Sequence, residues 1–169
     1  MSFSRFRGCW SAIGGTLVCA LVVGFLDVVS DGSCLCSAMI CPIWLVVAVV
    51  RSVLQRPGWG VAGARIFIPI VTLLLAVANY RVQKTIAVGN AALLIEACEQ
   101  YRANNGSYPK HLKDLVPRYL RSVPRAKYCC LWGEFAYFAS NRPLLLWYDL
   151  PPFGRWVYNF EKRRWRYLD

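Results

Sequence analysis

Histidine and acidic residues are scarce in this 169-residue chain, which has one histidine and nine Asp or Glu residues against 20 Lys or Arg residues. Its eight cysteines include no C-x-x-C pair and no Cys/His spacing typical of a zinc site. Walker motifs, Rossmann glycine motifs and paired catalytic carboxylates are absent from the sequence too. The usual signals of metal, nucleotide and acid–base chemistry are therefore missing. We expect a protein that is not an enzyme and uses no cofactor.

Apolar residues, by contrast, make up 57% of the chain, and their excess lies almost entirely before residue 81. Residues 81–169 carry 15 basic and seven acidic residues, which is +8 of the net charge of +11. This half is also rich in Trp, Tyr, Phe and Leu, which disordered segments lack. We therefore expect a membrane anchor over residues 1–80 and a folded domain over residues 81–169.

Three apolar stretches are about long enough to cross a hydrocarbon core of roughly 30 Å, namely residues 10–29, 35–54 and 61–80. Arg5 and Arg7 before the first stretch also fit a signal peptide. The sequence around residues 29–31 is a poor cleavage site, which favours an uncleaved anchor.

The short loops carry an uneven distribution of basic residues. Arginines occur before the first stretch and between the second and third, whereas the loop between the first and second has no basic residue. Because cytoplasmic loops are enriched in Lys and Arg, the N-terminus is predicted to be cytoplasmic and residues 81–169 to lie outside the cytoplasm.

The third stretch continues past Tyr80, without a proline or turn signal, into an amphipathic segment over residues 81–103. Spacings of three, four and seven predict a buried face made of Val82, Ile86, Leu93, Leu94, Ala97, Cys98 and Tyr101. We therefore predict one helix from about Ala64 to Ala103, partly in lipid and partly in water. Turn-forming residues at 104–109 are expected to end it.

The remainder predicts a small sheet. A short helix is expected over residues 110–119, ended or kinked by Pro117. Alternating aromatic and polar residues then predict strands at residues 134–140, 144–149, 155–159 and 164–168. Short links between them indicate an antiparallel meander. The predicted fold class is an α+β membrane protein: three transmembrane helices, the third continuing into a long amphipathic helix packed on a small antiparallel three- to four-stranded sheet.

Two motifs after the long helix carry a family resemblance: N-G-x-Y-P at residues 105–109 and L-x-x-L-V-P-x-Y-L at residues 112–120. With the preceding helix, the region of about residues 66–125 resembles type IV pilin-like proteins, most closely the major pseudopilin of type II secretion systems. The prepilin leader motif is missing, since no acidic residue follows Gly63 at the start of the helix and two apolar stretches precede it. The resemblance implies a pilin-like outer domain on a permanent anchor.

The resemblance also implies a function. We expect a non-enzymatic, multi-pass protein of the bacterial inner membrane that presents a pseudopilin-like periplasmic domain for protein–protein interaction. Type II secretion or pilus-like assembly is the process implied. The alternative is a membrane-embedded immunity or binding protein directed against a periplasmic partner. Membrane lipids and an envelope protein are the expected partners, and no nucleic acid is expected.

Three cysteines are candidates for a disulfide. Cys98, Cys129 and Cys130 would lie in an oxidising compartment if the predicted topology holds, and Cys98 is expected to pair with one of the other two. Free thiols are the alternative, and a membrane enzyme that uses Cys130 as a nucleophile is a third hypothesis.

The C-terminal run interleaves basic and aromatic residues. Its basic members are candidates for contact with anionic lipid headgroups or a polyanionic envelope polymer, and they are Lys162, Arg163, Arg164 and Arg166. The alternative is a hairpin strand whose aromatics pack inward while its arginines face water. The single histidine, His111, lies near Asp114 without an evident nucleophile, so we expect it to be a solvated structural residue.

Overall fold

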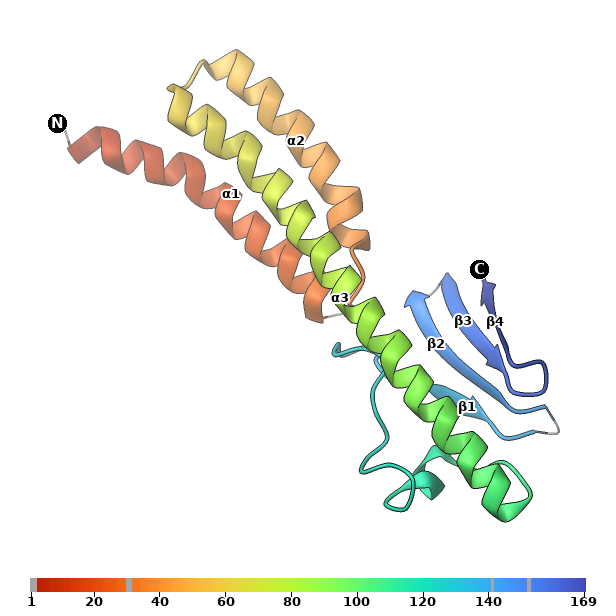
Figure 1. Ribbon diagram of the computed structural model, residues 1–169. Coiled ribbons are helices and arrows are strands. Elements are labelled where there is room, and N and C mark those ends of the chain that lie inside the picture. The colour runs from red at the N-terminus through yellow and green to blue at the C-terminus, as the bar shows by residue number, and fades with distance from the viewer. Residues whose placement is uncertain (1–2, 30–31, 141, 152) are drawn as a thin grey trace. The chain divides into compact units, whose positions relative to one another are not determined.

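A computed structural model describes residues 3–29, 32–140, 142–151 and 153–169, with side chains in the first helix described from Ile13 onward. This part of the chain forms three long helices, one short 3-10 helix and a four-stranded sheet (Figure 1). Internal contacts divide it into two units, Met1–Tyr80 and Arg81–Asp169. The protein is thus α+β, as the sequence predicts.

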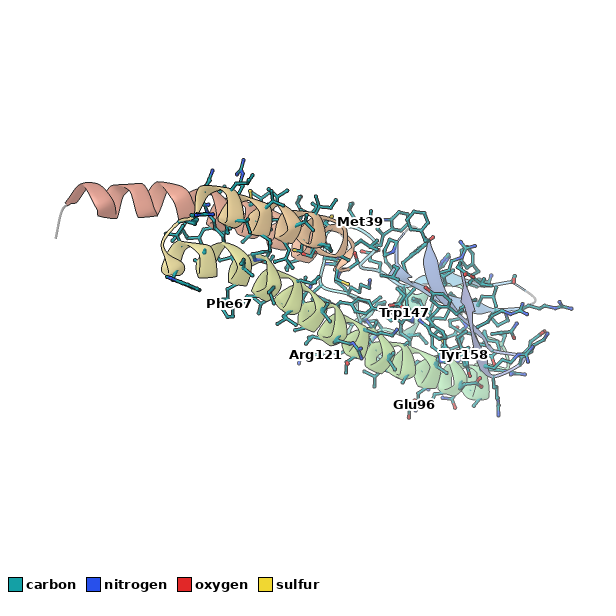
Figure 2. All side chains as sticks on the ribbon, turned by 90° about the horizontal axis from the view of Figure 1, so that it is seen from above. Met39, Phe67, Glu96, Arg121, Trp147 and Tyr158 are labelled. Carbon is teal, nitrogen blue, oxygen red and sulfur yellow. The ribbon has the colours of Figure 1, made fainter. Side chains whose placement is uncertain are left out.

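The first unit is helical. It contains α1 (Phe3–Val29), α2 (Leu35–Gln55) and the beginning of α3 (Trp59–Asn105). Helices α2 and α3 are long and apolar enough to cross a membrane, whereas the described apolar part of α1, Ile13–Val29, is shorter. Large apolar side chains point outward, among them Met39 and Phe67 (Figure 2). Two of the three expected spans therefore meet the length and hydropathy requirement.

Asp27 of α1 holds the first turn of α2. Its carboxylate is fully buried and accepts hydrogen bonds from the backbone N–H groups of Cys36 and Ser37, both at 2.9 Å. The first N–H groups of a helix have no partner within the helix, and the N-terminal end of the helix dipole favours a negative charge. Asp27 is therefore a helix cap supplied by a neighbouring helix, which its position in an apolar stretch did not reveal.

Helix α3 is unbroken from Trp59 to Asn105, which confirms the prediction of a single long helix. It ends at the predicted turn. Gly106 has a φ of +74°, and its N–H donates to the carbonyl of Arg102 at 2.8 Å. This left-handed conformation caps a helix C-terminus and is the one that glycine adopts without strain.

The second unit packs the continuation of α3 against a sheet. Its strands are β1 (Ala136–Phe138), β2 (Leu144–Leu150), β3 (Gly154–Asn159) and β4 (Arg164–Leu168). They neighbour one another in sequence order and pair antiparallel, so the predicted meander is confirmed (Figure 1). Trp147 and Tyr158 are buried in the core that the sheet forms with α3, while Glu96 is exposed on the helix (Figure 2).

The buried face of α3 matches the predicted one in part: Leu94, Ala97 and Cys98 belong to the core and Tyr101 packs against it, as predicted, whereas other positions differ. Its core residues are mostly small: Ala87, Ala91, Leu94, Ala97 and Cys98. Val82 and Leu93, which were expected inward, are 57% and 51% exposed. At about 100° per residue they lie more than roughly 100° around the helix from the centre of the buried face. Small side chains there let the large aromatics of the sheet pack close to the helix.

Two predicted elements are shorter than expected. Of residues 110–119, only Leu112–Leu115 is helical, as a 3-10 turn. Val116 is extended, with φ −100° and ψ 138°, because a following proline disfavours the helical conformation. Strand β1 has three residues instead of the expected seven, since it pairs with β2 only at Ala136–Phe138.

Candidate functional site

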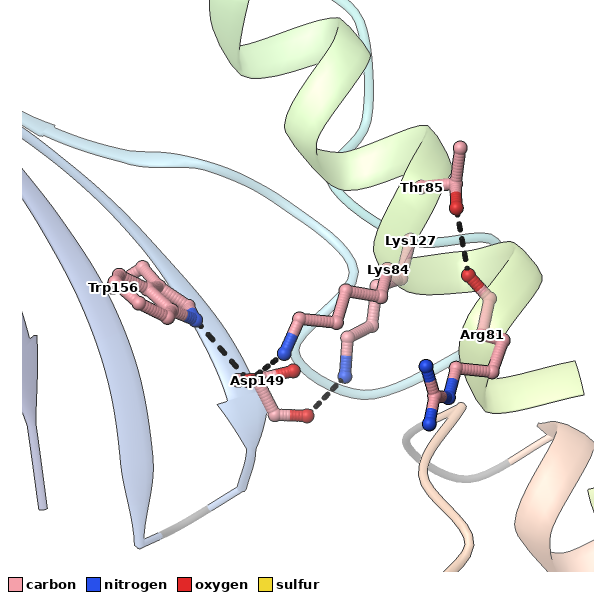
Figure 3. A network of polar contacts seen from close by, with 6 residues as sticks. All are labelled: Arg81, Lys84, Thr85, Lys127, Asp149 and Trp156. Carbon is pink, nitrogen blue, oxygen red and sulfur yellow. Dashed lines mark hydrogen bonds and ion pairs between the residues drawn. The ribbon is translucent and has the colours of Figure 1, made fainter. Parts of the chain in front are cut away.

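A buried polar centre lies where β2 ends against α3 (Figure 3). Asp149 is only 3% exposed, and its Oδ2 lies 3.0 Å from Lys84 Nζ of α3. Trp156 of β3 donates its indole N–H to the same oxygen at 3.1 Å. Lys127 donates from Nζ to the backbone carbonyl of Asp149 at 2.7 Å. We call these four residues the Asp149 centre.

The charges of the Asp149 centre indicate a structural role, in which it fastens segments of the second unit to one another; we call this role a clamp. Lys127 is fully buried, and a buried ammonium group requires polar partners because its desolvation is costly. Two ammonium groups around one carboxylate leave the centre positive, which disfavours a metal cation. Among the described residues, no three His, Cys, Asp or Glu side chains lie close enough to hold a metal ion. The centre joins α3, β2 and the segment before β1.

That segment is held along α3 by its own hydrogen bonds. Asn90 donates from Nδ2 to the carbonyl of Arg125 at 2.7 Å, and the N–H of Tyr128 donates to Gln83 Oε1 at 2.9 Å. The N–H of Lys127 donates to the carbonyl of Gly133 at 3.1 Å and closes the loop. A Cβ at Gly133 would come within 2.8 Å of two loop carbonyls, so only glycine fits there without a shift of the backbone. We call residues 125–133 the pinned loop.

The structure shows no disulfide between Cys98 and Cys129 or Cys130 of the pinned loop. Cys98 is fully buried in the α3–sheet core, and burial followed by the nearby Glu99 charge raises its pKa to about 12. Cys129 donates its thiol to the carbonyl of Leu131 at 3.0 Å, and Cys130 is exposed. Tyr128, the residue before Cys129, contacts α3 at Gln83, which is about 22 Å from Cys98 along the helix at roughly 1.5 Å per residue. Bonded cysteines need Cα atoms within about 7 Å, so the disulfide stays a prediction without support from this geometry.

The C-terminal basic run occupies the turn before β4 and β4 itself. Lys162 and Arg163 are exposed in the turn, where Arg163 Nη2 lies 3.9 Å from Glu99 Oε2 of α3. Arg164 and Arg166 are exposed on β4. Contact with an anionic surface remains a prediction for these four residues.

The aromatics of the run alternate with its arginines. The ring of Trp165 lies 5.2 Å from that of Tyr158, and the ring of Tyr167 lies 5.0 Å from that of Trp156. The side chains of Trp165 and Tyr167 are nevertheless each more than one-third exposed. The aromatics thus contact the neighbouring strand while the arginines face solvent.

His111 is exposed at the start of the 3-10 helix, and its backbone N–H donates to Asp114 Oδ2 at 2.8 Å. Asp114 therefore caps the helix and does not orient the imidazole for catalysis.

A shallow cleft of about 860 Å³ lies beyond the end of α3, lined by Tyr108, Arg102, Lys110 and Glu161 among others. Tyr108 donates to Glu99 Oε1 at 3.0 Å and accepts from Arg102 Nη1 at 2.9 Å. Burial raises the pKa of Tyr108, which keeps the phenol neutral and able to donate. Within the cleft, Tyr108 is thus held between Arg102 and Glu99.

These features define a class: an α+β protein with two helices of membrane-spanning character, of which the longer, α3, continues into a unit with an antiparallel meander. Comparisons of the chain with protein-family models, curated proteins and solved structures find no match. The function must therefore come from the geometry of the chain itself.

Proposed function

We propose that this protein is a membrane-anchored interaction protein of the bacterial envelope. In this proposal α1, α2 and the apolar part of α3 cross the inner membrane, and residues 81–169 form a pilin-like domain that binds a protein partner in the periplasm. The unbroken α3 carries the proposal. Up to Tyr80 it is apolar with exposed side chains, and beyond Arg81 it forms the core of a folded unit.

The chemistry of the second unit supports a binding role over catalysis. Its buried charged groups, Asp149 and Lys127, bond within the Asp149 centre. In the cleft beyond α3, Tyr108 is already bonded to Arg102 and Glu99. Enzyme sites instead collect convergent polar groups in a largely apolar pocket. The surface offers exposed arginines and exposed aromatics, the residue types that dominate protein interfaces.

The resemblance to pseudopilins supports the pilin-like part of the proposal. It rests on the long helix, the N-G-x-Y-P turn, the tethered 3-10 helix and the meander that follows. A role beside a secretion or pilus-like assembly follows from the same resemblance.

Topology is tested by fusing alkaline phosphatase, which is active only outside the cytoplasm, to the full chain after Asp169. A control fusion after Gln55 reports on the loop between α2 and α3. We expect activity from the first fusion and none from the second, because the arginines at this loop favour the cytoplasm. The reverse pattern contradicts the proposal.

The interaction is tested by crosslinking the intact protein in its own membrane and identifying the co-purified envelope protein. Arg164→Glu combined with Arg166→Glu reverses the exposed charge on β4, and Lys110→Glu with Lys113→Glu is the matched control. We expect the partner to be lost with the first pair and kept with the second. Recovery of no partner from the unaltered chain contradicts an interaction role.

A further inference from the structure

The pinned loop exposes apolar side chains at its tip. Tyr128 is 62% exposed, Leu131 56% and Trp132 45%, and Phe153 in the turn after β2 is 71% exposed. We call these four residues the apolar rim. Exposed loop tips are ordinarily small and polar. The loop does not need these side chains to close, since backbone, amide and ammonium groups hold it.

The members of the rim belong to one end of the second unit. Lys127 in the pinned loop bonds to Asp149, and the turn that holds Phe153 follows β2 directly. The ring of Trp132 lies 4.5 Å from that of Tyr148, also on β2. Loop and turn are thus fastened at the same strand end.

This end is the one at which α3 leaves its apolar stretch. Tyr128 bonds to Gln83 and Asp149 pairs with Lys84, both within the first turn after Tyr80. Gln83 is about 5 Å from Tyr80 along the helix at roughly 1.5 Å per residue. The other end of the unit is marked by Tyr137, whose hydroxyl donates to the carbonyl of Pro109 beyond the end of α3.

We propose that the apolar rim inserts into the headgroup region of the bilayer that α3 crosses. The headgroup region is roughly 5–7 Å thick on each side of the hydrocarbon core, so a loop fastened about 5 Å past Tyr80 lies within its depth. Trp and Tyr concentrate at this level because their rings are apolar and carry a polar N–H or O–H. Exposed Arg125 belongs to the pinned loop, and exposed Arg81 lies on α3 next to Tyr80; both carry the charge that matches lipid phosphates.

This inference rests on the proposed function, because it requires α3 to be a membrane span. It adds a second contact between the domain and the membrane. It also states that the rim binds lipid and not protein.

The experiment places a photoreactive benzoylphenylalanine in the full chain at Trp132, at Phe153 or at Phe138. Phe138 is a matched control, because it is an aromatic residue that is 55% exposed and lies on β1 next to Tyr137, at the other end of the unit. Each variant is reconstituted in vesicles of phosphatidylethanolamine and phosphatidylglycerol, irradiated and examined by mass spectrometry. We expect phospholipid adducts at positions 132 and 153 and none at 138.

Alkaline carbonate extraction of the same vesicles shows whether a negative result concerns the rim alone or the membrane anchor as well. Protein that stays in the membrane but forms no adduct at 132 or 153 overturns the rim inference and leaves the anchor in place. Protein released by carbonate overturns the proposed anchor and the rim with it. Equal adducts at all three positions, or adducts to protein instead of lipid in native membranes, overturn the assignment of the rim to the headgroups.

Discussion

At the scale of single residues, a few buried groups carry much of the specificity of the second unit. Asp149, Lys127 and Cys98 are each less than 5% exposed, so their chemistry is set by neighbours instead of water. Removing one member of a buried charged group leaves its partner unpaired, which costs more than the pair itself contributes. The sequence predicts the burial of Cys98 but not the roles of Asp149 and Lys127, because the lysine partners of Asp149 lie 22 and 65 residues away along the chain.

Asp149→Asn should destabilise the second unit by about 1–3 kcal/mol, less than for a fully buried pair because Lys84 is 37% exposed and stays solvated. The amide removes the charge facing Lys84 and weakens the clamp that Lys127 completes. Glu161→Gln is the control, since its contact with Arg142 is 3.7 Å long and exposed, and it should cost about 0.5 kcal/mol. Denaturant unfolding of the detergent-solubilised chain, followed by near-UV circular dichroism, measures both. Equal effects would contradict the clamp.

The thiols of Cys98 and Cys130 should differ sharply in reactivity. A maleimide should label exposed Cys130 in the folded protein and reach Cys98 only on unfolding, because Cys98 is fully buried and its raised pKa keeps it a thiol. Peptide mass mapping after brief labelling measures this. Labelling of Cys98 at the rate of Cys130 would show that the core opens.

Stability should also fall in alkali. Burial raises the pKa of the Cys98 thiol from its ordinary value of 9.0 to about 12, so its contribution is complete below pH 9 and is lost as pH rises towards 12. Burial raises the pKa of Tyr137 and Tyr158 as well, which acts in the same direction. Unfolding measured at about pH 8 and about pH 10.5 should show a lower free energy at the higher pH. Cys98→Ala should flatten this slope and Cys130→Ala should leave it unchanged.

At the scale of elements, the length of α3 and the choice of its buried face have different causes. Its continuation past Tyr80 follows from a run without proline after Pro69, and its end follows from a glycine at the C-terminal cap; both are visible in the sequence. Its inward face follows from the shape of the opposing sheet. Val82 and Leu93 were predicted to be buried because they are large and apolar. The buried positions are instead held by small residues such as alanine, because the large aromatic side chains of the sheet pack against them.

Ala91→Leu should destabilise the second unit by about 1–3 kcal/mol, because Ala91 is fully buried against the core and extra methyl groups overpack it. Ala92→Leu is the matched control, since Ala92 is the next residue and is exposed. The same unfolding measurement should show almost no change for it. A larger loss at residue 92 would mean that the buried face of α3 is misassigned.

At the scale of the whole molecule, the division of α3 into an apolar part and a core-forming part is the feature on which the proposed function depends. Leu75 and Val88 are both large, apolar and exposed, at 66% and 55%. They lie on opposite sides of the boundary at Tyr80. An exposed apolar residue is favourable in lipid and nearly neutral in water, so a charge placed at each position distinguishes the two surroundings.

Leu75→Arg should impair insertion of α3, by at most the roughly 2.5–3.5 kcal/mol that a charge costs at the centre of a span, whereas Val88→Arg should leave insertion unchanged. The activity of a phosphatase fused after Asp169, normalised to protein level, measures the fraction of domains translocated. We expect lower activity for the first variant alone. Equal activity in both variants contradicts a membrane span that ends near Tyr80.

The sequence by itself determined the elements whose causes are local. The extent of α3 follows from periodicity, the turn at Gly106 from residue type, and the strand order from the short links between strands. Periodicity also placed Leu94, Ala97 and Cys98 on the buried face of α3, whereas only the tertiary structure decided that Ala87 and Ala91 are buried in place of Val82 and Leu93. It alone decided the cap at Asp27, the Asp149 centre and the pinned loop. Each of these depends on backbone and side-chain groups that are distant in sequence and meet only when the helices and the sheet have packed.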